Sequence, residues 1–260
     1  ESIPKVKGEQ KKVNMPQDWN VFNTIPENKS FFLYEGSIIN SPCTEGVTWI
    51  IFDDAYIEQM AEREVLLKNN NDVIVIDKNS EDAARELLDA TLHFLCEVDG
   101  FEVSEKEVIT RDHRMIKIDY SEPLLTCGLL VQNDFCVLQK IDGQHVLTAA
   151  VLCFPANWRL KEKFMSPLFS IHRNVPEYSL EIAKRVDRIF NGIRVGQPMW
   201  RFNVLEYSDA TLYQPYRLRP ECKPSYTRSE RQTFVKLPDT GAVVFGIHTF
   251  VVKKAPSGAF

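Results

Sequence analysis

Three segments of the chain are predicted to be helices, two of them from apolar residues that recur at helical spacing. Residues 52–68 combine strong helix formers with acidic residues near the start, which favours a helix. A second helix, which Ser80 can cap, has its apolar residues on one stripe at spacings of three and four. The stripe consists of Ala84, Leu87, Leu88, Thr91, Leu92 and Leu95. Residues 177–194 show the clearest helical pattern. Its apolar positions are Ile182, Val186, Ile189, Phe190 and Ile193.

Alternating or β-branched apolar runs predict strands in most of the remaining chain. The predicted strands cover residues 73–76, 115–120, 128–140, 144–154, 200–207, 226–237 and 241–253. Asp142 and Gly143 separate the third run from the fourth, and Asp-Gly between two apolar runs predicts a β-hairpin. Pro155 is expected to end the fourth strand, because proline has no N–H for a ladder bond.

This order of elements predicts the α+β class, with an antiparallel sheet flanked by helices. Successive strands joined by short turns favour antiparallel pairing, and the grouped helices argue against a doubly wound sheet. Residues 1–30 are polar and contain three prolines, so we expect an N-terminal arm at 1–48 and a single domain at 49–260. The longest apolar runs reach about half of the ~20 residues that a membrane helix needs. The first residues lack the apolar core of a signal peptide.

The composition of the chain excludes several classes of function. The chain has 260 residues, with 31 Lys and Arg against 36 Asp and Glu, for a net charge of −5. This balance predicts binding neither to nucleic acid nor to an anionic membrane. No two of the six cysteines form a C-x-x-C pair, which argues against a zinc ribbon, a thioredoxin motif and a cysteine-ligated iron–sulfur cluster. Cys96 and Cys153 lie within apolar runs, so we expect buried free thiols and a cytoplasmic location.

His172 has the most suggestive neighbourhood of the five histidines. Nearby apolar residues are Met165, Leu168, Phe169, Ile171 and Val175, and nearby cations are Lys161, Lys163 and Arg173. Flat apolar contacts, one imidazole and cations for carboxylates are what a haem requires. A partly buried histidine with satisfied hydrogen bonds is the simpler alternative, and composition alone favours it.

Two further segments carry candidate polar sites. One is a cluster comprising Arg217, Arg219, Arg228, Glu230, Arg231 and Lys236. In a strand, Arg228, Glu230 and Gln232 share one face. An anion clamp is one interpretation, but composition favours an edge strand with solvated charges. In the other segment, residues 200–203, Arg201 and Asn203 share one face. Trp200 and Phe202 share the other, and the simple expectation there is an apolar face on the core with the polar face outward.

Several short motifs occur in a characteristic order along residues 50–252. They are Glu122 to Leu124, Leu130 to Asp134, the CFPANW run at 153–158, Lys163 with 167–168, 171–172 with 175–176, the WRFN run at 200–203, and 228–233 with 237–238, 241–242 and Phe245. Together these motifs resemble the family of the haem-dependent oxidative N-demethylase alpha subunit.

The resemblance implies a PAS-like fold that holds a b-type haem non-covalently. It also implies O2-dependent oxidation of a small methylated amine with release of formaldehyde. Electrons would come from an external reductant such as NADPH through flavin and iron–sulfur partner subunits. The chain itself has neither a nucleotide phosphate-binding motif nor a cysteine cluster, which agrees with an electron-transfer partner on another polypeptide.

Residue by residue, the resemblance makes His172 the axial iron ligand. It makes Lys163, Arg201, Asn203 and Arg228 cofactor-binding residues. Glu230 and Gln232 become the catalytic residues of the distal, substrate-facing side.

Three positions depart from the family pattern. Val204 stands where tryptophan is expected, His248 where arginine is expected, and Asn133 where glutamate is expected. These departures leave the substrate open and make His248 a rival iron ligand. Two alternatives therefore remain. One is a PAS-like module that binds or senses haem or a small ligand without turnover, and the other is a haem enzyme of the same fold with a different substrate.

Overall fold

The computed structural model of the chain describes residues 31–36, 47–52, 55–69, 72–172, 180–216 and 224–253. Its centre is a six-stranded sheet with the order β3-β8-β7-β11-β10-β9. The strands are β3 (Ile74–Ile76), β7 (Asp134–Ile141), β8 (Gln144–Val151), β9 (Met199–Tyr207), β10 (Tyr226–Lys236) and β11 (Val243–Lys253). All five pairings are antiparallel, which confirms the predicted α+β class.

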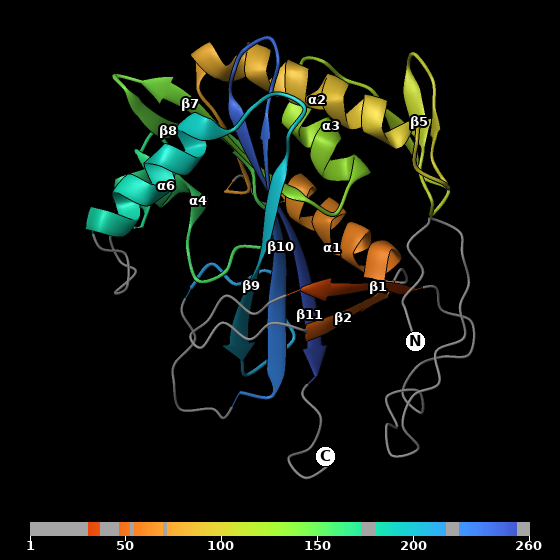
Figure 1. Cartoon of the computed structure of the whole chain (residues 1–260). Coiled ribbons are helices and arrows are strands. Elements are labelled where there is room, and N and C mark those ends of the chain that lie inside the picture. The colour runs from red at the N-terminus through yellow and green to blue at the C-terminus, as the bar shows by residue number, and fades with distance from the viewer. Residues whose placement is uncertain are drawn as a thin grey trace.

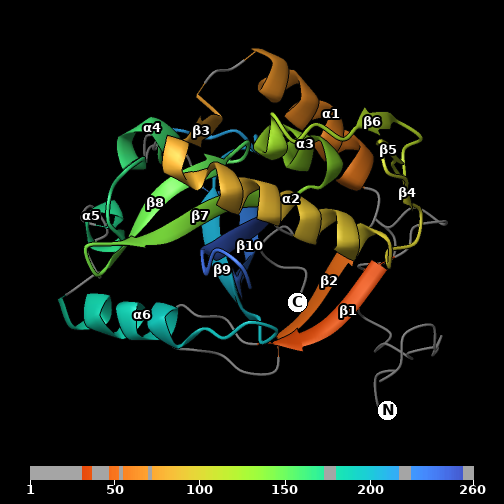
Figure 2. The same ribbon diagram turned by 90° about the horizontal axis from the view of Figure 1, so that it is seen from above.

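Helices lie on both sides of this sheet (Figures 1 and 2). On one side are α1 (Ala55–Asn69), α2 (Glu81–Leu95), which follows the short 3-10 helix η2 (Lys78–Ser80), and α3 (Pro123–Leu130). On the other side are α4 (Leu160–Lys163), α5 (Leu168–Ile171) and α6 (Leu180–Gly192). We call the two sides of the sheet the α1–α3 face and the α4–α6 face.

Two small antiparallel sheets accompany the central one. The first pairs β1 (Phe31–Gly36) with β2 (Val47–Phe52). The second contains β4 (Glu102–Val103), β5 (Glu107–Ile109) and β6 (Met115–Lys117). Residues 1–30 of the predicted N-terminal arm lie outside the described residues, as do Arg173, Val175, Arg217 and Arg219.

Strand alternation divides the hydrophobic core between the two faces. Val137 and Val244 belong to the cluster that packs under α2 and α3. Their neighbours Cys136 and Val243 belong to the cluster that packs under α6. The predicted stripe of α2 is buried throughout. The stripe of α6 is only half covered, because Phe190 and Ile193 are buried whereas Ile182 and Ile189 are exposed.

The predicted β-hairpin is confirmed. β7 and β8 are joined at Asp142 (φ 48°) and Gly143 (φ 81°), and the favoured two-residue turn requires positive φ at both positions. β8 ends at Val151, before the expected residue 154.

Three local predictions are wrong. The strand at 128–140 begins only at Asp134, since Gly128 and Leu130 belong to α3, which has Pro123 in its first turn. A short apolar run fits a buried helix as well as a strand, and Pro123 starts a helix with its φ already set. The strand at 115–120 ends at Lys117. Ser80 precedes α2 without capping it, because its hydroxyl donates to Gln139 instead.

The cysteine prediction is confirmed for Cys153, which is buried with a free thiol, as are Cys127 and Cys136. Burial raises the pKa of each of these three thiols to about 12, so they stay protonated and unreactive. The prediction is wrong for Cys96, which is exposed because it lies just past the end of α2. Cys43 and Cys222 lie outside the described residues. None of the described helices has the length and apolar character to cross a bilayer.

Candidate functional site

Five of the predicted site residues form one hydrogen-bonded chain across β9 and β10. Arg201 Nε donates to Gln232 Oε1 (2.8 Å), and Gln232 Nε2 donates to Glu230 Oε2 (3.0 Å). Asn203 Nδ2 donates to the same glutamate oxygen (3.3 Å). Arg228 Nε donates to Glu230 Oε1 (3.2 Å). We call these five residues the polar ladder. The sequence pattern placed Arg228, Glu230 and Gln232 on one face, and these contacts confirm it.

Most of the polar ladder is buried on the α4–α6 face. Arg228, Glu230 and Gln232 are 0%, 4% and 6% exposed. They lie on β10, which pairs with a strand on each side. The interpretation of this segment as an edge strand with solvated charges is therefore wrong, because the sequence does not show which strands flank it.

The expected orientation of residues 200–203 is also wrong in part. Phe202 is buried as expected, but Trp200 on the same side is 58% exposed. Arg201 is exposed, as expected, and Asn203 is half-buried, but the side chains of both bond to buried groups of β10 instead of pointing freely into solvent. This side of β9 thus completes the polar ladder.

Arg228 fixes the position of Glu230 from inside the protein. Its Nη2 donates to the carbonyl of Phe154 (2.6 Å) and to the Thr249 hydroxyl (3.4 Å), and its Nη1 donates to the carbonyl of Leu212 (2.9 Å). With the bond to Glu230, four of its five N–H donors have internal partners. Arg228 is therefore built to hold the carboxylate of Glu230 in one orientation.

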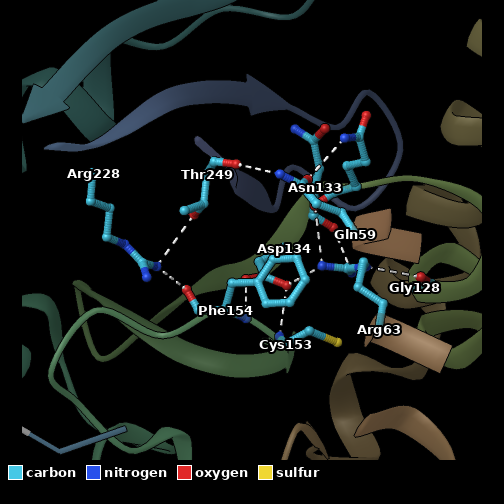
Figure 3. A network of polar contacts seen from close by, with 10 residues as sticks. Gln59, Arg63, Gly128, Asn133, Asp134, Cys153, Phe154, Arg228 and Thr249 are labelled. Carbon is cyan, nitrogen blue, oxygen red and sulfur yellow. Dashed lines mark hydrogen bonds and ion pairs between the residues drawn. The ribbon is translucent and has the colours of Figure 1, made fainter. Parts of the chain in front are cut away.

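A second buried network meets the polar ladder at the main chain of Phe154 (Figure 3). Asp134 Oδ1 accepts from Arg63 Nη1 (2.6 Å) and from the N–H of Cys153 (2.7 Å). Asp134 Oδ2 accepts from the N–H of Phe154 (2.8 Å). The carbonyl of Phe154 in turn accepts from Arg228. A continuous polar path therefore runs from α1 to Glu230.

Arg63 is a residue that the sequence reasoning missed. It is 0% exposed and donates to the carbonyls of Gly128 (3.1 Å), Gln132 (3.1 Å) and Asn133 (2.9 Å). An arginine within an amphipathic helix ordinarily lies on the solvated face, so no local pattern marks it. The run from Leu130 to Asp134, noted for its resemblance to a known family, is the segment that receives these contacts.

His172 follows α5 and is held in a defined tautomer. Its Nδ1 is 2.9 Å from the carbonyl oxygen of Leu168. Because a carbonyl can only accept, Nδ1 carries the proton and the lone pair lies on Nε2. Burial lowers the pKa of His172, and the positive charges of Lys163 and Arg201 lower it further. His172 is therefore a neutral imidazole with the tautomer that metal-binding histidines use.

Two cations lie near His172 against aromatic rings. Lys163 Nζ is 4.4 Å from the centroid of the Trp158 ring, and burial lowers the pKa of this lysine. The guanidinium of Arg201 is 6.0 Å from the centroid of the Phe234 ring. The structure thus brings together His172, Lys163 and the polar ladder, although residues 163 and 201 are far apart in sequence.

His248 lies on the opposite face of the sheet. Ile247 belongs to the core of the α4–α6 face, so its neighbour His248 points toward the α1–α3 face. Its ring centroid is 4.2 Å from that of Phe250, and its Nε2 is buried without a hydrogen-bond partner. Burial lowers the pKa of His248 to about 3, and the cations Arg231 and Arg63 add to the effect. The structure therefore separates His248 from the polar ladder.

His248 is expected to make the protein sensitive to acid. An unfolded histidine has a pKa of about 6.5, so below that pH the unfolded state binds a proton that the folded state excludes. Stability is then complete above pH 6.5 and falls toward pH 3, by about 2 kcal/mol at pH 5. The variant His248→Phe should lose this part of the pH dependence in urea unfolding at pH 8 and pH 5. The exposed His93 supplies the control His93→Gln. An unchanged pH dependence in His248→Phe contradicts the prediction.

The chemistry of these side chains fits a haem better than an ion held by side chains alone. Among the residues that the structure describes, no three His, Cys, Asp or Glu side chains gather as a metal-ligand cluster. A haem iron takes four ligands from the porphyrin and needs only an axial group from the protein. One neutral imidazole, two nearby cations and the apolar side chains of Ile171 and Phe234 are the kinds of group that contact a haem in proteins.

An antiparallel α+β domain with this residue set defines a candidate haem protein. The chain matches the family model described as "Haem-dependent oxidative N-demethylase, alpha subunit-like" over residues 43–255. Since the match covers most of the chain, the protein belongs to this family, which confirms the resemblance seen in the sequence. The description points to a haem-dependent oxidative enzyme and to a subunit that works with others.

Proposed function

We propose that this chain is the haem-binding oxygenase component of an enzyme that oxidises a small methylated amine. The observation that carries the proposal is the fixed, neutral tautomer of His172, next to Lys163 and Arg201 and close to the polar ladder. Membership of the family supports haem-dependent oxidation. The antiparallel sheet, with helices inserted between β8 and β9, supports a PAS-like architecture.

His172 would bind the iron of a non-covalent b-type haem through Nε2. The donation from Nδ1 to Leu168 keeps the ring oriented, as the outer partners of metal-bound histidines do. Lys163 and Arg201 are the cations for the propionates, and Asn203 and Arg228 shape the pocket by holding Glu230. When bound, the haem supplies the oxygen activation and one-electron chemistry that side chains cannot.

Glu230 would hold the amine, with Gln232 as its support. A carboxylate offers about four acceptor sites, and three donors already reach Glu230. The remaining site suits the N–H of a methylammonium group. Because Glu230 is buried, little water competes with a ligand N–H for this site.

Electrons would come from another polypeptide. In the overall reaction one oxygen atom ends in formaldehyde and the other in water, which consumes two electrons and two protons. The alpha-subunit description supports partner subunits, and we propose flavin and iron–sulfur carriers that pass electrons from NADPH. The reduced, buried Cys127, Cys136 and Cys153 support a cytoplasmic location.

The test begins with the absorption spectrum of the purified chain with added haemin. We expect a Soret band that His172→Ala loses or shifts, because this change removes the axial imidazole. His93→Ala, on the exposed side of α2, and His248→Ala, on the opposite face of the sheet, should leave the band unchanged. A colourless protein that ignores haemin refutes haem binding, and a shift in His248→Ala alone refutes the assignment of His172.

Turnover separates an enzyme from a binding module. With a chemical reductant, O2 and dimethylamine, the haem-loaded chain should release formaldehyde. Haem binding without oxidation of any methylated amine would contradict the proposal and favour a binding or sensor module. Oxidation of a different class of compound would support a haem enzyme but contradict the assignment of a methylated amine as its substrate.

A further inference from the structure

An open groove of about 650 Å³ lies between α5, α6 and the beginning of β8. Its volume is within the range of small-molecule sites, roughly 300–1,000 Å³. The argument uses six of its lining residues, which are His145, Leu168, Phe169, Lys184, Asp187 and Arg188. Among the described residues that line it, none belongs to the polar ladder and none is His172.

A histidine–aspartate pair closes the polar side of the groove. His145 Nδ1 is 3.4 Å from Asp187 Oδ1, and the histidine side chain is 7% exposed. Burial lowers the pKa of His145, although Asp187 acts in the opposite direction. The second oxygen of Asp187 accepts from Asn191 Nδ2 (2.9 Å). Both oxygens of this carboxylate are thus engaged within the protein.

The two cations in the lining, Lys184 and Arg188, outnumber its one carboxylate, Asp187, so the net charge that a ligand meets is positive. Lys184 and Arg188 stand one turn apart on α6, so their side chains are neighbours on the helix surface. Within the described part of the chain, neither has an ion-pair partner. A guanidinium beside an ammonium matches a carboxylate. Across the groove, α5 presents Leu168 and Phe169, the latter 43% exposed, which suit an apolar group.

We propose that this groove is a second binding site, which takes an organic anion with a carboxylate and an apolar body. Lys184 and Arg188 bind the carboxylate, and Leu168 and Phe169 contact the apolar part. The site is coupled to the oxidation site through α5, because the carbonyl of Leu168 fixes the ring of His172. The coupling, unlike the binding itself, rests on the proposed function.

The experiment titrates decanoate, below its micelle concentration, into the haem-free chain by calorimetry. We expect binding that weakens at least 10-fold in Lys184→Gln/Arg188→Gln, while acetate, which lacks the apolar body, binds weakly or not at all. The matched control is Arg185→Gln, which removes an exposed cation of the same helix outside the groove. No binding, or equal weakening in the control, overturns the proposal.

A second titration tests whether the groove binds a separate organic acid or the propionates of the haem. Decanoate should still bind the haemin-loaded chain and shift the Soret band. If haemin displaces decanoate, the groove is the haem site, and the second site is refuted while the proposed function stands. If decanoate binds but haemin does not, the proposed function fails and the groove assignment remains.

Discussion

Replacing Asp134 with alanine is expected to lower the free energy of unfolding by about 3–5 kcal/mol. Asp134 and Arg63 are both fully buried, so this change leaves the Arg63 guanidinium in the interior without its counter-charge. The N–H groups of Cys153 and Phe154 lose their acceptor at the same time. Urea unfolding at pH 7, followed by circular dichroism, measures the loss.

The matched control is the exposed ion pair between Arg85 and Glu81. Glu81→Ala also removes the carboxylate partner of an arginine, but this pair is exposed to water. The change should therefore lower the free energy of unfolding by less than about 1 kcal/mol. Asp134→Asn keeps one acceptor oxygen and should fall between these two results. A loss in Asp134→Ala no larger than that in Glu81→Ala would show that the buried pair does not stabilise the fold.

Replacing Glu230 with glutamine is expected to reduce kcat/KM for the methylated amine by about 10- to 100-fold, because a hydrogen bond to a charged group contributes about 1.5–3 kcal/mol. The change removes the negative charge and places an amide N–H among the donors of Asn203 and Gln232. Steady-state formaldehyde release measures the rate, and the Soret band reports whether haem still binds.

Glu206→Gln is the control for this variant, since Glu206 is an exposed residue of β9. It should leave both the rate and the Soret band as they are. Full activity in Glu230→Gln would remove Glu230 from the substrate site. Loss of the Soret band in that variant would instead assign Glu230 to haem binding.

The parts of the fold that were predictable rest on local patterns. The stripe of α2 and the turn at Asp142 and Gly143 depend on neighbours a few residues away, and both predictions were correct. The helix α3 was missed because its apolar run has no period that separates a buried helix from a strand.

The candidate site depends on contacts that are distant in sequence. Alternation placed Glu230 and Gln232 on one face, but their burial follows from the strands on both sides of β10. The approach of Lys163 and Arg201 to His172 depends on tertiary packing, which the spacing of these residues in the sequence does not predict. Arg63 carries no local signal, since its partners come from α3 and the loop that follows it.

The meeting of the two buried networks at Phe154 has a consequence for sequence divergence. The groups that join Asp134 to Arg228 are the N–H and the carbonyl of residue 154, and every amino acid except proline supplies both. Other apolar side chains can therefore replace the aromatic one at this position in evolution without loss of the connection. Relatives of this protein can retain the link between α1 and the polar ladder with no conserved side chain at its midpoint.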